Sequence, residues 1–311
     1  MTERQLKPAD RVEITVLVDN YTDSLINTPS TPVDRRLPYN PDRRLLAEHG
    51  LSCHVKVFSG NKEHAILLDA GLSDTCLPWN AFQVGVSLAG IEAVVLSHGH
   101  YDHTGALEHA VAGAGRQVPL IAHPDAFLPR RRNIPGAGVF GQRSPDIVAL
   151  KKAGADIKMR SKPSTLAAGH ILVTGEVEWK VRFEKGLPGA EIERDGKWTP
   201  DSIRDDQALV MNVKEKGLVV VSGCAHAGII NTVEYAKRIT GIDRVHAVLG
   251  GFHLSGKAYE KIVPPTIDAM KKINPDYIVP MHCTGWTTIN RFMGAMPEKC
   301  ILNTVGTTYV F

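Results

Sequence analysis

The sequence lacks the features that mark several protein classes. No run of apolar residues approaches the ~18 that a membrane-spanning helix needs, and the first seven residues show no apolar core of a secretory signal. The net charge is only +3 over 311 residues, too small an excess to favour nucleic acid or an anionic membrane as a partner. We therefore expect a cytoplasmic protein that binds neither.

Cysteine is scarce, and the positions of the cysteines do not suggest structural cross-links. The five cysteines are an odd number and include no Cys-x-x-Cys pair, so neither a disulfide framework nor a structural zinc knuckle is expected. Hydrophobic residues make up 43 % and charged residues 22 %, which excludes disorder as the dominant state. A chain of this length can bury a large core without such staples. The oligomeric state stays open.

Histidine, by contrast, is concentrated in one place. Three of the thirteen histidines fall in the segment HGHYDH at 98–103, directly after a short apolar run at 93–97 that predicts a buried strand. In an extended turn the first two histidines can hold one ion, while the aspartate and the last histidine face a second. Imidazole and carboxylate ligands suit zinc, manganese and iron. We predict one or two divalent transition-metal ions, zinc first, held here by His98, His100, Asp102 and His103.

This motif, placed between an apolar strand and Thr104-Gly105, resembles the metallo-β-lactamase superfamily. The resemblance implies an α/β (α+β) chain folded as a four-layer αββα sandwich, with metal between the two sheets. Strands and helices recur in both halves without a linker, so we expect one domain over residues 1–311. ITVLVDN at 14–20, GCAHAGIINT at 223–232 and GGFHL at 250–254 sharpen the likeness. They resemble the branch that includes the dihydropterin/ribofuranosylaminobenzene-phosphate synthases of the methanopterin pathway.

Later and earlier segments supply further candidates for the site. His282 follows a predicted strand at 277–280, as the last histidine of the superfamily does, and His226 lies between a strand end and a helix start. Both are predicted metal ligands. Asp69 resembles the early aspartate that supports the histidine loop, with a turn-forming role as the alternative. Glu48 and His49 could lie near the site through the same subgroup match.

One position departs from the superfamily pattern. The strand before His226 ends in Gly223-Cys224, where the usual pattern has an aspartate that bridges two metals. Cys224 could be a soft ligand or simply a small buried hydrophobe. Alternatively, His226 could serve both segments, the second ion could bind weakly, or Asp205 and Asp206 could contribute instead.

Two stretches predict substrate loops, at 127–145 and 185–204. The first is irregular, basic and too long for a plain connector. Arginine forks suit phosphate and carboxylate, although a charge run is often only a solvated face. His253, after a Gly-Gly turn, could donate a hydrogen bond to a substrate oxyanion or be purely structural. The predicted substrate-binding residues are Arg130, Arg131, Arg132, Arg143 and His253.

These residues favour a metal-dependent hydrolase that activates water to cleave an ester, lactone, amide or phosphoester bond in a small anionic molecule. Asp102 and His253 are the predicted catalytic residues, with Asp102 holding metal and orienting the nucleophile. A pterin transferase, condensing a dihydropterin pyrophosphate with an aminobenzene ribose phosphate, is the alternative that the resemblance implies. A non-catalytic metal-dependent ligand binder and an iron redox protein stay open, although the chain has no room for the flavin domain that the latter would need.

Overall fold

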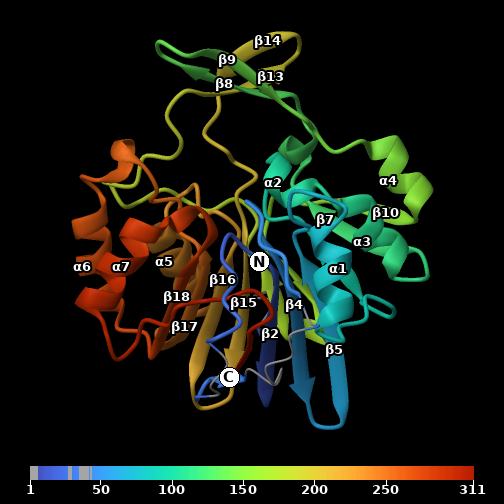
Figure 1. Ribbon diagram of the computed structural model, residues 1–311, viewed down its shortest axis with the longest axis vertical. Coiled ribbons are helices and arrows are strands. Elements are labelled where there is room, and N and C mark those ends of the chain that lie inside the picture. The colour runs from blue at the N-terminus through green and yellow to red at the C-terminus, as the bar shows by residue number, and fades with distance from the viewer. Residues whose placement is uncertain (1–5, 27–29, 35–41, 43) are drawn as a thin grey trace.

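The computed structural model describes residues 6–26, 30–34, 42 and 44–311, and its two large sheets face one another (Figure 1). Part of the loop predicted at 21–44 lies outside the described residues. The first sheet contains, in spatial order, β11 (Ser164–Leu166), β12 (Ile171–Val173), β15 (Ala208–Val213), β16 (Gly217–Ser222), β17 (Val245–Gly251) and β18 (Tyr277–Met281), with β1 (Pro8–Ala9) also paired to β15. β16, β17 and β18 run parallel to one another.

The second sheet carries the amino-terminal half of the chain and the last strand. Its spatial order is β10 (Ala155–Met159), β7 (Val118–Ala122), β6 (Ala93–Val95), β5 (Lys62–Leu68), β4 (Ser52–Ser59), β2 (Arg11–Val18), β19 (Thr308–Val310) and β3 (Val33–Asp34). β4 and β5 form the predicted hairpin. β5, β6 and β7 then run parallel, as connections through helices require.

Helices cover the outer face of each sheet, which completes the predicted αββα sandwich (Figure 1). The second sheet is covered by α1 (Cys76–Gln83), α3 (Leu107–Gly113) and α4 (Ile147–Ala153), and the first by α5 (Ile229–Thr240), α6 (Val263–Ile273) and α7 (Trp286–Ala295). α5 ends at Thr240 and is followed by Gly241, whose φ of 70° suits glycine. Within the described residues, no helix has the length and apolar character to cross a membrane.

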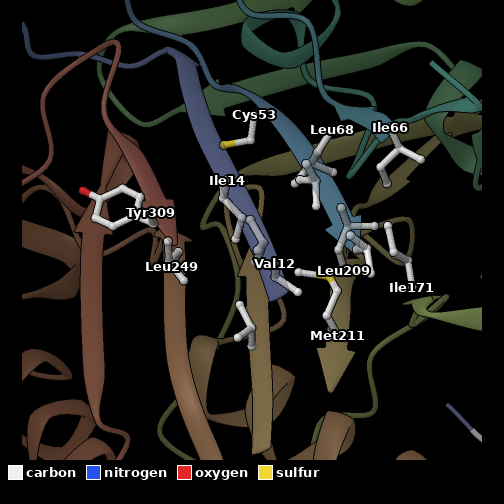
Figure 2. Packing of buried hydrophobic residues seen from close by; sticks show 14 of the residues in the cluster. Val12, Ile14, Cys53, Ile66, Leu68, Ile171, Leu209, Met211, Leu249 and Tyr309 are labelled. Atoms are coloured by element: carbon white, nitrogen blue, oxygen red, sulfur yellow. The ribbon is translucent and has the colours of Figure 1, made fainter. Parts of the chain in front are cut away.

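The main core lies between the two sheets. Val12 and Ile14 from β2 meet Leu209 and Met211 from β15, and Leu249 extends this layer along the first sheet (Figure 2). Each of these residues is fully buried. Separate apolar clusters lie between each sheet and its helices. The strand ends that carry the candidate site are therefore held by packed side chains on both faces.

A third sheet corrects the expectation of two irregular loops. β8 (Arg130–Ile134) and β9 (Gly138–Gln142) form a hairpin within 127–145, and β13 (Ala190–Arg194) and β14 (Lys197–Pro200) form another within 185–204. β13 pairs with β8, which joins the two hairpins into a four-stranded sheet, called here the cap sheet (Figure 1). All residues of β9 except Gln142 are exposed, so its sequence carries no apolar alternation that would predict a strand.

Candidate metal centre

Parallel strands deliver the candidate residues to one edge of the sandwich. The carboxyl ends of neighbouring parallel strands lie together, and loops after them are a usual place for binding sites. The strands β5, β6, β16, β17 and β18 each end just before a candidate: Asp69, His98, Cys224, His253 and His282, respectively. Residues far apart in the sequence thus meet around the loop between β6 and α2 (Tyr101–Thr104).

Three imidazoles, from His98, His100 and His226, form what we call the histidine cluster. Nε2 of His98 lies 3.0 Å from Nδ1 of His100, and Nε2 of His226 lies 3.1 Å from the same nitrogen. All three side chains are buried. Burial holds the pKa of each well below the ordinary histidine value, and the charges of Arg130 and of neighbouring imidazoles lower it further. The rings are therefore neutral at pH 7, with lone pairs available for a cation.

A second group of donors adjoins the first, and we call it the mixed cluster. It comprises Asp102, His103, Cys224 and His282, whose ligand atoms all lie within 4.8 Å of one another. Nε2 of His103 is 3.2 Å from Sγ of Cys224, and Nε2 of His282 is 3.3 Å from Oδ2 of Asp102. Sγ of Cys224 also lies within 4.8 Å of ligand atoms of His98 and His226. The cysteine therefore stands between the two clusters.

Buried partners fix the two imidazoles of the mixed cluster. Oδ2 of Asp69 accepts a hydrogen bond from Nδ1 of His103 at 2.6 Å, and its carboxylate also accepts from the backbone and hydroxyl of Ser97. Nδ1 of His282 donates to Oδ1 of Asn20 at 3.0 Å. These contacts turn Nε2 of each ring toward the cluster, as the outer partners of metal-binding histidines do.

Charge distinguishes the mixed cluster from the histidine cluster. Burial opposes protonation of His103, but Asp69 and Asp102 outweigh it and raise the pKa of His103 to about 9. Burial likewise opposes ionisation of Asp102, yet His103 and His282 hold its pKa well below the usual range. A cation that binds Nε2 of His103 would displace its proton, so metal binding here competes with protonation.

The donor set fits two transition-metal ions. A tetrahedral zinc with nitrogen ligands needs nitrogens separated by ~3.3 Å, close to the spacings within the histidine cluster. Nε2 of His282 is buried and, among the described residues, has only the ion-pair contact with Oδ2 of Asp102 at 3.3 Å and no well-formed hydrogen bond, an arrangement that a bound cation would satisfy. His98, His100 and His226 would hold one ion, and Asp102, His103, His282 and Cys224 a second.

Several known proteins are similar to this chain in sequence and in fold. The metallo-β-lactamase superfamily is matched over residues 52–184. A 7,8-dihydropterin-6-methyl-4-(β-D-ribofuranosyl)-aminobenzene-5'-phosphate synthase from Methanocaldococcus jannaschii is 34 % identical over 259 residues, covering 81 % of this chain and 86 % of the relative. The chain belongs to the metallo-β-lactamase superfamily.

Two further relatives agree with that membership. An uncharacterized protein of the same organism is 32 % identical over 249 residues, covering 80 % of this chain and 89 % of the relative. A solved structure described as a metal-dependent hydrolase of the β-lactamase superfamily is 25 % identical, with a TM-score of 0.74 and coverage of 96 % and 98 %. The predicted likeness to the synthase branch is confirmed by the 34 % identity to the Methanocaldococcus jannaschii synthase.

Three further acidic candidates near the site, Asp205, Asp206 and Glu48, accept hydrogen bonds from the protein. Oδ2 of Asp206 accepts from the backbone of Ala227, and Glu48 accepts from the backbone and hydroxyl of Ser73. Oδ2 of Asp205 accepts from the backbone of Gly99. None of the three belongs to a ligand group within the described residues. They fix the loops that carry the ligands, and Cys224 occupies the place where the superfamily pattern has an aspartate.

The structure separates the predicted substrate-binding residues. The ring centroid of His253 lies 4.2 Å from that of His226, so His253 borders the histidine cluster. Arg130 is buried and paired with Asp201 and Asp205. Arg143 is exposed. These arginines therefore differ in their surroundings, although the sequence groups them.

Sequence reasoning placed His49 near the site only through the subgroup match, and it missed Asn20. Nε2 of His49 lies 3.4 Å from Oδ2 of Asp102, and the ring is 5.0 Å from that of His282, with about half of its side chain exposed. Asn20 contacts both imidazoles. The available signal was the polar pair at the end of the strand 11–18, a position that often carries function.

Proposed function

We propose that this chain is a metal-dependent hydrolase of small phosphate-bearing substrates. The observation that carries the proposal is a pair of adjoining buried ligand clusters near the cap sheet, together with Arg132 of that sheet, whose Nε is buried and has no hydrogen-bond partner among the described residues. Two metals spaced by a shared ligand are a recurrent device for phosphoester hydrolysis. Contacts of the cap-sheet arginines support a phosphate-binding role for the cap sheet.

Strand alternation divides the arginines of β8 between two faces of the cap sheet. Arg131 pairs with Glu191, opposite it on β13, and stacks on Trp198. Arg130, on the other face, reaches Asp205, whose second oxygen accepts from Gly99 in the ligand loop. The Arg130 face is thus the one that meets the metal centre.

Arg132 shares that face but has a different environment. Its Nε is buried and has no hydrogen-bond partner among the described residues. Burial raises the pKa of Tyr101 and of Tyr259, and the charge of Arg132 acts on both hydroxyls and opposes that rise. Tyr101 follows His100, and the ring of Tyr259 meets that of His253 at 5.2 Å. The charge of Arg132 therefore acts on residues next to His100 and His253, and an arginine fork at this place can bind phosphate.

The protein groups would divide the chemistry between them. The bound ions would supply positive charge that lowers the pKa of water and polarises the scissile phosphoryl group. Asp102, with His49 and His282 near its Oδ2, would help to hold the second ion and orient the attacking group. His253 would donate a hydrogen bond to a substrate oxygen, and Arg132 would bind the phosphate from the cap.

A second candidate function is a pterin-pathway synthase. The specific observation in its favour is the 34 % identity to the Methanocaldococcus jannaschii synthase over 81 % of this chain. The product in that relative's name carries a phosphate, so the proposed role of Arg132 applies to both functions. The synthase reaction would use the same ligand clusters to hold the leaving group of a pterin substrate.

A paired assay distinguishes the two functions. The protein, loaded separately with zinc, manganese or iron, is incubated with a panel of phosphoesters and lactones, and separately with a dihydropterin pyrophosphate plus an aminobenzene ribose phosphate. The hydrolase proposal predicts phosphoester turnover that is lost on chelation and restored by metal. A condensed pterin product without phosphoester turnover would contradict it and favour the synthase.

A further inference from the structure

The five cysteines fall into two groups. All are buried, but Cys53, Cys76 and Cys300 each pack inside an apolar cluster, the usual fate of a buried thiol. Cys224 and Cys283 belong to none of these clusters in the described structure. Their thiols instead lie at the polar edge of the sandwich, after β16 and β18. Simple packing therefore accounts for three thiols and leaves two unexplained.

The side chain of Cys283 is directed toward Cys224 across β17. Its Sγ lies 3.7 Å from the carbonyl oxygen of Cys224. Gly251 makes this approach possible, since a Cβ at that position would lie only 2.6 Å from the Cys283 sulfur. Any residue other than glycine would displace the thiol from its place beside Cys224.

An imidazole completes the group. Ligand atoms of Cys224, Cys283 and His253 all lie within 4.8 Å of one another. Nδ1 of His253 is buried and finds no hydrogen-bond partner in the described part of the chain. The residue has a φ of 44°, a backbone conformation that residues other than glycine rarely adopt and that is concentrated at functional sites. The side chain of His253 is partly exposed, which leaves a route for a small cation.

We propose that Cys224, Cys283 and His253 bind a thiophilic divalent cation, such as Zn²⁺ or Cd²⁺, at a site that adjoins the two-ion centre and shares Cys224 with it. Two sulfurs and a nitrogen are a common donor set for zinc, with edges of ~3.4–3.8 Å in a tetrahedral site. Each thiol that binds the cation releases its proton to the solvent. Hard cations such as Mn²⁺ prefer carboxylate and water and would leave this site empty.

This inference does not depend on the proposed hydrolysis. It predicts a protein that accepts manganese without any sulfur ligation from Cys283 and then takes up cadmium through two thiolates. Cys224 alone could act as a ligand of the mixed cluster, so sulfur from Cys283 is the decisive signal.

The test is the near-ultraviolet absorption of thiolate bound to cadmium, measured per bound Cd²⁺ on the manganese-loaded protein. We expect the wild type to show about twice the absorption of Cys283→Ser, because one of two thiolates is lost. Cys300→Ser is the matched control and should equal the wild type. Equal absorption in the wild type and Cys283→Ser would overturn the proposal.

A second measurement needs no variant, so a folding defect in Cys283→Ser cannot obscure the answer. X-ray absorption at the cadmium edge counts sulfur neighbours directly in the wild-type protein. Two sulfurs and at least one lighter ligand per cadmium are expected. One sulfur or none would contradict the site.

Discussion

The histidine cluster and the mixed cluster lie side by side but differ in charge and support. His98, His100 and His226 are neutral imidazoles that repel one another when protonated. In the mixed cluster, His103 is protonated in the absence of metal and is held between Asp69 and Asp102. A cation that binds the histidine cluster therefore meets neutral imidazoles. A cation that binds the mixed cluster must first displace the proton on His103.

Because of this difference, the binding of the two ions should depend on pH in different ways. Protons compete with a cation at the histidine cluster only in acid, since the pKa values there are lowered. At His103 they compete up to about pH 9. The mixed cluster should therefore bind its ion more weakly than the histidine cluster does at neutral pH.

The largest effects are expected from loss of a ligand in either cluster. His98→Ala should remove the first ion and His282→Ala the second, and each should lower activity by more than the ~10–100-fold that loss of an outer partner costs. Metal analysis and turnover of each variant check this. His109→Ala is a control on the helix next to the site. Full metal retention in either ligand variant would contradict the assignment.

Asp69→Asn should weaken only the mixed cluster. The amide cannot hold the His103 proton as a carboxylate does, so affinity for the second ion should fall ~10–100-fold, with the first ion retained. Stepwise metal titration by calorimetry separates the two events. Equal weakening of both ions would break the distinction between the clusters.

The stability of the metal-free protein should have opposite pH dependence in the two clusters. The lowered pKa values of the histidine cluster cost stability as pH falls below the ordinary 6.5, because the unfolded chain then binds more protons. The raised pKa of His103 adds stability that is fully present below 6.5 and is lost as pH rises toward about 9. Urea unfolding from pH 5 to 9 should therefore show less alkaline loss in Asp69→Asn than in the wild type. The same alkaline loss in both would be contrary evidence.

Arg132→Ala should raise KM for a phosphate-bearing substrate ~10-fold or more, the effect of losing a charged hydrogen bond. Metal content should not change, because Arg132 is not a ligand. Arg131→Ala is the matched control, since this neighbour faces Glu191 and Trp198 on the other side of the cap sheet. Similar KM values for the two variants would exclude Arg132 as the phosphate-binding residue.

The smallest effect is expected from Cys224→Asp. An aspartate at this position has the superfamily's usual donor type and should keep both ions, while shifting preference from zinc toward manganese. Competitive loading with the two metals measures the change. An unaltered preference would show that the Cys224 thiol is not a ligand.

The αββα sandwich followed from the family resemblance and is confirmed, whereas the strand and histidine motif at 93–103 rest on local signals. An apolar strand followed by His98, His100, Asp102 and His103 needs no tertiary knowledge, and His226 and His282 stand at predicted strand ends. Cap-sheet strands escaped prediction because few of their residues pack in a core. α7 was also missed, although it packs through Phe292.

Partners contributed by distant segments could not be read from the sequence. Arg130 and Arg132 look alike until Asp201 and Asp205, about 70 residues later, bind the first of them. The proximity of Cys283 to Cys224 depends on the pairing of β18 with β17, which the sequence pattern does not show. Asn20 likewise reaches His282 across 262 positions. Such contacts depend on how sheets pack, which periodicity does not specify.

The most direct test is the number of metal ions per chain in protein purified without chelators. Elemental analysis of the wild type should give close to two manganese or iron ions, and close to one in both His98→Ala and His282→Ala. Zinc can also occupy the site of Cys224, Cys283 and His253, so a zinc-containing wild type should give two ions or more. One ion or fewer in the wild type would contradict the two-cluster centre. It would mean that Cys224 does not replace the aspartate expected from the superfamily pattern.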